Sequence, residues 1–145
     1  MGTLWHMKVH SKDFTVGAGD GCDLIDVTDR VQAALDESEL NAGIVSVSVV
    51  GSTGGVSTIE FEPGLRRDVP ELMEQLVPSN RSWAHDETWH DGNGFSHLRS
   101  FLTGTSFTAP FREGRLLLGT WQQIVVVNFD NRPRERRVVV QILGE

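Results

Sequence analysis

The C-terminal part of the chain, TSFTAPFREGRLLLGTWQQIVVVNFDNRPRERRVVVQIL (residues 105–143), decides the fold class. Stretches rich in β-branched and aromatic residues alternate here with short turns such as REG (112–114) and NRPRE (131–135). Strands joined by connections this short pair antiparallel, because a parallel crossover needs a dozen or more residues. A doubly wound parallel sheet is therefore the weaker alternative.

The rest of the chain adds further strands and helices. Strand-like patterns occupy residues 8–16, 43–50 and 56–62. Helical patterns occupy 24–38 with Asp23 as cap, 68–77 with Asp68 as cap, and 97–103 with Asn93 or Ser96 as cap. We predict an α+β single domain over residues 7–145, with a largely antiparallel sheet or sandwich, two longer helices and one short helix. Residues 1–6 are expected to be an expression remnant or a flexible N-terminus.

Composition restricts the function. The net charge of −7 argues against a nucleic-acid binder, which needs a basic face. No run approaches the roughly 18 apolar residues of a membrane helix, so no membrane partner is expected. Cys22 is the single cysteine, which excludes a disulfide within the chain and suits a reducing cytoplasm.

The stretch HDETWHDGNGFSHLRS (85–100) is the first candidate site. It holds three histidines, His85, His90 and His97, around a glycine-containing loop. Zinc binds imidazole nitrogens, and harder ions such as Mg²⁺ prefer carboxylates like the one that Asp86 supplies here. The spacing matches no recognised zinc signature, so a polar loop that leads into a helix is the alternative interpretation.

The turn GSTGG (51–55) is the second candidate. Its small residues, free N–H groups and the hydroxyls of Ser52 and Thr53 are typical of an anion-binding nest. The turn lacks the lysine and the glycine spacing of a nucleotide P-loop, and a simple hairpin turn is the alternative. Glu60, which follows on the next strand, is a candidate metal ligand or base, or a solvated side chain.

Two further groups complete the candidates. Trp121 and Gln122, in LGTWQQ, suggest a ring that stacks on a ligand beside a hydrogen-bonding amide, although a core tryptophan is commoner. No G-x-S-x-G nucleophile elbow is present. The arginines of RPRERR (132–137) are expected on a solvated turn and strand face or at a subunit contact.

These motifs together resemble the secondary thiamine-phosphate synthase family of YjbQ-like proteins. The resemblance runs from about residue 8 to the C-terminus and rests on GSTGGVSTIEFEPGLRRDV (51–69), HDETWHDGNGFSHLRSFLTGTSFTAPFREGRLLLGTWQQIVVVNFD (85–130) and RRVVVQILGE (136–145). It implies a small cytoplasmic α+β protein that forms homotrimers, with a metal-associated site built around histidines near subunit boundaries.

Residue by residue, the resemblance carries over the histidines His85 and His97, the acidic Glu60 and the motif Thr120, Trp121 and Gln122. The chain departs from the family at Gly51, where many members have a histidine, so His90 or a carboxylate would have to replace that ligand. The expected divalent ion is zinc, magnesium or manganese.

The implied activity is thiamine-phosphate synthesis, which joins a pyrimidine methyl diphosphate to a thiazole phosphate. For this reaction Ser52 and Thr53 would bind phosphate, Arg99 and Arg115 would clamp the diphosphate, and Asp86 and Glu60 would serve the metal or act as bases. Other metal-dependent phosphoester chemistry and a non-enzymatic trimeric metal- or metabolite-binding protein are the alternatives. The expected partner of the enzyme is a phosphorylated small-molecule substrate.

Overall fold

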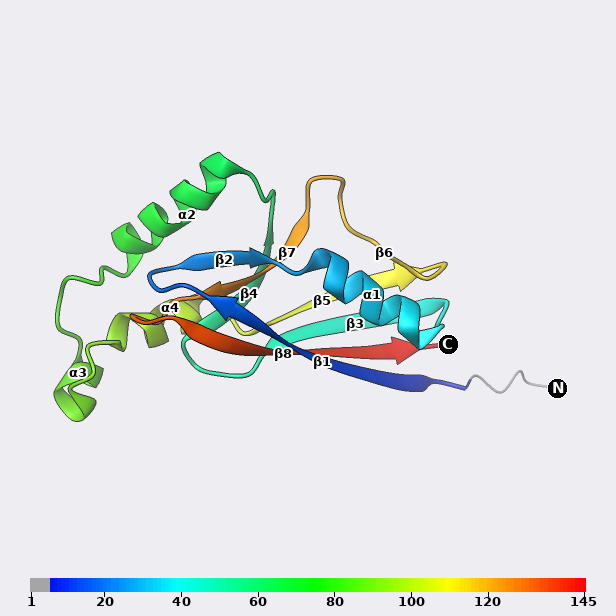
Figure 1. The fold of residues 1–145 in the computed structure, drawn as a ribbon, viewed down its shortest axis with the longest axis horizontal. Helices are drawn as coiled ribbons and strands as arrows, with labels where there is room; N and C mark the ends of the chain where they lie inside the picture. The colour runs from blue at the N-terminus through cyan, green and yellow to red at the C-terminus, as the bar shows by residue number, and fades with distance from the viewer. Residues whose placement is uncertain (1–5) are drawn as a thin grey trace.

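The computed structural model describes residues 6–145, which form a β-sandwich flanked by helices (Figure 1). The prediction for residues 1–6 lies outside the described residues except at His6. The α+β class, the single domain and the antiparallel pairing are confirmed. Within residues 6–145 no helix is long and apolar enough to cross a membrane.

The larger sheet has five strands, and every pair in it is antiparallel. Its order is β1 (Lys8–Ala18), β8 (Arg134–Gly144), β3 (Ala42–Val49), β5 (Ser106–Arg112) and β6 (Arg115–Leu116). On β8 the residues alternate between buried and accessible over most of the strand, as expected when one face of a sheet covers a core.

The smaller sheet has three antiparallel strands, in the order β2 (Asp23–Asp26), β7 (Gln123–Asn128) and β4 (Gly54–Ile59). Strand β7 is buried on both faces. Ile124 and Val126 belong to the core shared with the larger sheet, whereas Val125 and Val127 belong to a second apolar cluster on the outer face. The continuous apolar run IVVV therefore marks a central strand between two apolar layers.

Helix α1 (Thr28–Ser38) lies beside the smaller sheet and closes the same core with Val31, Ala34 and Leu35. The predicted helix 24–38 was too long, because residues 23–26 form β2. Leu24 pairs with Val127 on β7, so tertiary pairing overrides the helical spacing of these four residues. The predicted cap Asp23 accordingly lies in a strand.

Helix α2 (Pro63–Leu76) lies over the outer face of the smaller sheet (Figure 1). The predicted start at Asp68 was wrong. The Glu62 carboxylate accepts hydrogen bonds from the N–H groups of Gly64 and Leu65 at 2.8 and 2.5 Å, which caps the helix, and Pro63 occupies its first turn. Pro70 therefore lies inside the helix.

Helices α3 (Ala84–Trp89) and α4 (Gly94–Thr103) lie at the end of the sandwich remote from β6 (Figure 1). The loop predicted before the short helix contains α3, a helix of six residues that the sequence pattern did not predict. Helix α4 begins three residues earlier than predicted. The histidines of the first candidate site are carried by these two helices and the turn between them.

Candidate functional site

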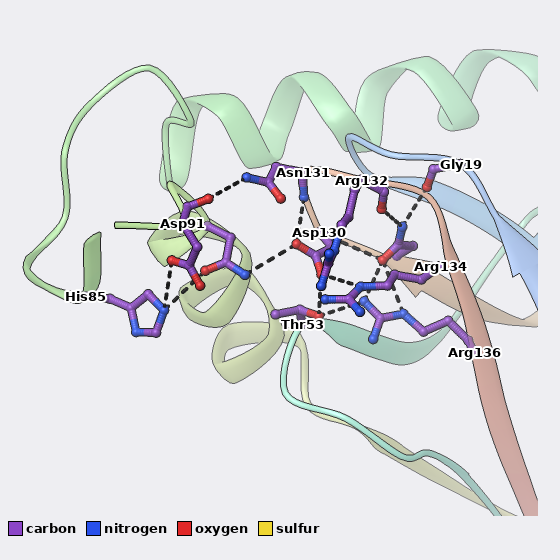
Figure 2. A network of polar contacts seen from close by, with 11 residues as sticks. Gly19, Thr53, His85, Asp91, Asp130, Asn131, Arg132, Arg134 and Arg136 are labelled. Carbon is purple, nitrogen blue, oxygen red and sulfur yellow. Dashed lines mark hydrogen bonds and ion pairs between the residues drawn. The ribbon is translucent and has the colours of Figure 1, made fainter. Parts of the chain in front are cut away.

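His85 of α3 and His97 of α4 face each other at the end of the sandwich. Their ring centroids lie 4.3 Å apart, and the ring planes are tilted by 46°. The Nε2 atom of His85 lies 3.6 Å from a carboxylate oxygen of Asp91. The structure therefore brings two of the three predicted histidines together. It also places the Asp91 carboxylate beside His85 (Figure 2).

The side-chain amide of Asn93 lies between His85 and Asp91 on one side and the buried Asp130 on the other. With its nitrogen toward Asp91, it donates to the two carboxylate oxygens at 3.0 and 3.2 Å and to His85 Nε2 at 3.1 Å. In the opposite orientation the nitrogen makes a longer contact of 3.4 Å to Asp130. We favour the first orientation because its three contacts are all shorter than the single contact to Asp130.

Asp86 holds the two helices in this arrangement. Its carboxylate accepts hydrogen bonds from the N–H groups of Trp83 at 2.9 Å and Gly94 at 2.8 Å, which are the groups that start α3 and α4. These two bonds lower the pKa of Asp86, because they stabilise its ionised form. Asp86, predicted as a catalytic group, is used in this way to position the helices that carry His85 and His97.

A surface depression of about 350 Å³ opens beside His97. It is bounded by the turn after β3 and by α4, and its lining residues include Gly51, Ser52, His97, Ser100, Phe101 and Thr105. Of the turn residues predicted to bind phosphate, Ser52 is exposed in this depression. Thr53 is buried behind it.

Thr53 joins a buried polar network beneath the turn (Figure 2). The Arg136 guanidinium of β8 donates from Nη2 to Thr53 Oγ1 at 2.7 Å and to Asn128 Oδ1 at 2.5 Å, and its Nε donates to Asn128 at 3.2 Å. Arg136 is only 6% exposed. Within residues 6–145 its Nη1 atom donates no hydrogen bond to another side chain. That atom lies 3.1 Å from the position that a Cβ would occupy if Gly51 were replaced by a larger residue.

Asp130 supplies the negative charge of the network. Its carboxylate is fully buried and accepts from Arg134 Nε at 2.7 Å and from the N–H of Asn131 at 2.9 Å. Burial raises the pKa of Asp130, but the bonds from Arg134 and Asn131 outweigh it, and the net direction is downward. Burial likewise lowers the pKa of Arg136, although a guanidinium stays protonated.

The described residues do not form a ready metal cage. Among residues 6–145 no group of three or more His, Cys, Asp or Glu side chains is placed to hold an ion. His90 is exposed at the C-terminal end of α3, in the left-handed conformation, and does not complete a set with the other two. Structural zinc sites in proteins use four protein ligands and catalytic zinc sites use three. The divalent ion that the sequence predicts therefore stays a prediction.

Comparisons with known proteins give the family. The family model "UPF0047 protein YjbQ-like" matches residues 12–145. The chain belongs to the UPF0047 (YjbQ-like) family. A UPF0047 protein of Archaeoglobus fulgidus is 37% identical over 131 residues, which cover 90% of this chain and 99% of that protein.

Solved structures agree with this family. A YjbQ-like protein of unknown function from Sulfolobus solfataricus is 36% identical, with a TM-score of 0.91 over 97% of this chain and 100% of that one. A hypothetical protein from Aeropyrum pernix is 35% identical, with a TM-score of 0.86 over 93% and 98% of the two chains.

These relatives correct the predicted activity. They are described as UPF0047 proteins, as hypothetical or as of unknown function, and thiamine-phosphate synthesis is not among their descriptions. The resemblance identified the YjbQ-like family correctly, but the synthase activity attached to it was wrong, because the relatives supply a family and no reaction. The expected homotrimer stays a prediction.

Arg99, which was predicted to clamp a diphosphate, has a structural role in this UPF0047 protein. Its side chain is buried, donates from Nε and Nη2 to the Val77 carbonyl at 3.0 and 2.8 Å, and pairs with Glu74 at 2.7 Å. The guanidinium also lies 4.8 Å from the Phe95 ring centroid. Arg99 therefore ties α4 to the C-terminal end of α2 and does not line the depression beside His97.

The other predicted residues lie elsewhere in the described chain. Trp121 is 70% exposed in the loop before β7, where the neighbouring Gln122 donates to Thr58 of β4 at 3.2 Å. Thr120 shares this exposed loop, and Glu60 is exposed just after β4. Arg115 lies on β6 at the opposite end of the sandwich from α3 (Figure 1). Within one chain, these five predicted residues do not join His85 and His97.

Arg136 and Asp130 are the site residues that the sequence analysis missed. The stretch around Arg136 was expected to be solvated or to form a subunit contact. The alternation along residues 136–142 carried the missing signal, because Arg136 shares a strand face with Val138, Val140 and Ile142, all of them buried. A charged residue on the same strand face as buried apolar residues is uncommon, and it indicates a charge that is paired or that serves a function.

Proposed function

We propose that this UPF0047 protein binds the phosphate group of a small molecule in the depression between the Gly51–Thr53 turn and α4. The observation that carries the proposal is the buried guanidinium of Arg136, whose Nη1 lies beside Gly51 and has no side-chain acceptor within the described chain. A buried cation with an unused donor at the edge of a depression favours an oxyanion ligand, because burying a charge without a partner costs free energy.

The charges of the buried network support the same ligand. Arg134 and Arg136 each contribute one positive charge, and Asp130 contributes one negative charge, which is taken up by its bond with Arg134. The sum over these three residues is +1, although the whole chain carries −7. An anion beside Arg136 would balance this local excess, and arginine binds the oxygens of phosphate with two parallel donors.

Backbone donors are available at the same place. Within residues 6–145, the N–H groups of Gly51, Ser52 and Thr53 donate to no backbone carbonyl. Three successive free N–H groups beside a guanidinium match the requirements of an anion nest. The exposed hydroxyl of Ser52 and the imidazole of His97 would supply further hydrogen bonds from the two sides of the depression.

Titration with inorganic phosphate and pyrophosphate, followed by ¹H–¹⁵N NMR, tests this proposal. We expect the amide signals of Gly51, Ser52 and Thr53 to shift most. Arg136→Met should weaken binding at least tenfold, since a hydrogen bond to a charged group contributes about 1.5–3 kcal/mol. Arg136→Lys keeps the charge but loses the paired N–H donors of the planar guanidinium, and should give an intermediate affinity.

Arg137→Met is the matched control. It removes the same charge from the next residue of β8, whose side chain is exposed and pairs with Asp13 at 2.5 Å. Binding that falls equally in both methionine variants would show only a long-range charge effect and would contradict a site at Arg136. Absence of shifts at the turn in the wild-type protein would refute the proposal even if Arg136→Met does not fold.

A further inference from the structure

A second cavity lies between α2 and the outer face of the smaller sheet, away from the histidines. Its volume is about 450 Å³, within the range of small-molecule pockets. Apolar side chains make up most of its wall, among them Leu24, Val69, Met73, Val127 and Phe129. The cavity is distinct in lining from the depression at His97, because the two share no residue.

Helix α2 covers this cavity without closing it. Val69, Leu72, Met73 and Leu76 follow one another at helical spacing and all line the cavity. Nevertheless none of the residues of α2 is fully buried, and Leu72 and Leu76 stay exposed. An amphipathic helix normally buries its apolar stripe, so the stripe of α2 still has room for an apolar occupant.

A cationic region continues the cavity toward the start of α2. Leu24 lines both the apolar cavity and an adjoining hollow whose other lining residues include Asp23, Arg66 and Arg67. Arg66 lies one helical turn before Val69, and its guanidinium lies 4.7 Å from the Phe61 ring centroid. Neither arginine forms a salt bridge within the described part of the chain. Asp23 is the only acidic residue among the lining residues, and the Glu62 carboxylate, which caps the same helix, interacts with Arg67 from outside the lining.

From these observations we propose that the groove beneath α2 binds a linear aliphatic carboxylate. The hydrocarbon chain lies against Val69, Met73 and the outer face of the sheet, and the carboxylate pairs with Arg66 and Arg67. An arginine guanidinium can donate two parallel hydrogen bonds to a carboxylate head. The apolar chain supplies the affinity through the surface that it removes from water.

The test uses protein labelled with ¹³C at the methionine methyl groups, titrated with octanoate, decanoate and decan-1-ol below their aggregation concentrations. Met73 lines the cavity, whereas Met7 is exposed at the start of the described chain and serves as an internal reference. We expect decanoate to shift the Met73 signal alone, with one molecule bound per chain. Each added methylene should tighten binding roughly fourfold, and decan-1-ol should bind at least tenfold more weakly than decanoate.

Two sets of variants separate the contribution of the hydrocarbon chain of the ligand from that of its carboxylate. Met73→Trp fills the cavity and should abolish binding, while Gln75→Trp, on the exposed side of the same helix, should leave the affinity within twofold. Because Met73→Trp removes the reporter, calorimetry measures both of these variants. Replacing Arg66 and Arg67 together with Ala should reduce decanoate binding to the level of decan-1-ol.

Several outcomes would overturn the proposal. If decanoate does not shift Met73, or if Met73→Trp and Gln75→Trp bind equally well, the groove is not the site. Equal affinity for decanoate and decan-1-ol, or tighter binding of decyl phosphate, would refute the carboxylate head. A Met73 shift that appears only with phosphatidylglycerol vesicles, or only as the protein concentration rises, would mean that a membrane or a second copy covers the groove.

Discussion

The hydroxyl of Thr53 and the guanidinium of Arg136 are 2.7 Å apart, although 83 residues separate them in sequence. This contact fixes the turn after β3 against strand β8 and leaves Arg136 Nη1 beside Gly51. Because the same guanidinium also donates to Asn128 on β7, it joins the two sheets of the sandwich at the edge of the proposed phosphate site. The stability of this end of the fold and its affinity for an anion are therefore expected to change together.

Gly51→Ala tests this coupling. Gly51 has φ 156°, which L-residues rarely adopt, and an added Cβ would lie 3.1 Å from Arg136 Nη1. We expect the variant to lose about 1 kcal/mol of unfolding free energy in urea and roughly tenfold in phosphate affinity. Gly119→Ala is the control, since a Cβ there meets only ordinary contacts of 3.6 Å or more. Unchanged phosphate affinity in Gly51→Ala would argue against a ligand at this turn.

Glu74 gives the fold a predictable response to acid. Burial alone would raise its pKa, but hydrogen bonds from Ser79 and the ion pair with Arg99 outweigh burial and lower the pKa to about 2. A lowered folded-state pKa stabilises the protein above the unfolded-state value of about 4.5, and that stabilisation is lost as the pH falls toward 2.

Glu74→Gln should therefore lower the unfolding free energy by about 1 kcal/mol at pH 7, a modest value because nearly half of the Glu74 side chain is exposed to solvent. The difference from the wild type should shrink between pH 4.5 and 2, as measured by urea unfolding followed by circular dichroism. Glu71→Gln, an exposed change on the same helix, should alter neither quantity. A difference that grows toward acid pH would contradict the role of the Glu74–Arg99 pair.

Gly144→Ala tests the packing of β8 against β3. A Cβ at Gly144 would lie 2.3 Å from the Ala42 carbonyl oxygen and 2.8 Å from the Phe111 ring, so backbone would have to move. We expect a loss of about 3 kcal/mol or more by urea unfolding. Gly17→Ala, in the paired strand β1, meets only the flexible carboxylate of Glu135 and should cost less than about 1 kcal/mol. Similar losses in both variants would mean that strand propensity, and not the backbone clash, determines the cost.

Local patterns predicted much of the fold, and tertiary pairing explains the errors. Short turns and apolar runs predicted the strands of residues 105–143 and their antiparallel class correctly. Of the neighbouring strands in this stretch only β5 and β6 pair with each other, because β7 belongs to the smaller sheet and β8 pairs with β1 and β3. The pattern failed at residues 24–26, where pairing with β7 overrides helical spacing, and at α3, whose six residues are too few for a periodic signal.

The candidate site was predictable only in part for a similar reason. His85 and His97 could be predicted from their place in a single polar segment. Arg136 and Asp130 meet Thr53 of the turn after β3 only when the sheets form, so spacing along the sequence cannot place them there. The alternation on β8 would have shown that Arg136 points inward, but it could not have shown which turn it meets.

The two imidazoles provide a final prediction about metal binding. His85 and His97 are close enough to act together, whereas His90 is exposed and belongs to no cluster within residues 6–145. Zinc added to the protein should therefore shift the imidazole signals of His85 and His97 in the same titration and leave His90 unchanged, as followed by NMR of ¹⁵N-labelled histidine. His85→Gln should remove the response of His97, because a single imidazole is not enough to hold zinc, while His90→Gln is the matched control.

Mass-spectrometric metal content after dialysis provides a second readout. Because one chain supplies only two imidazole ligands, it should retain less than one equivalent of zinc. A shift of His90 together with the pair would show that the loop closes round the ion and would restore the three-histidine site that the sequence suggested.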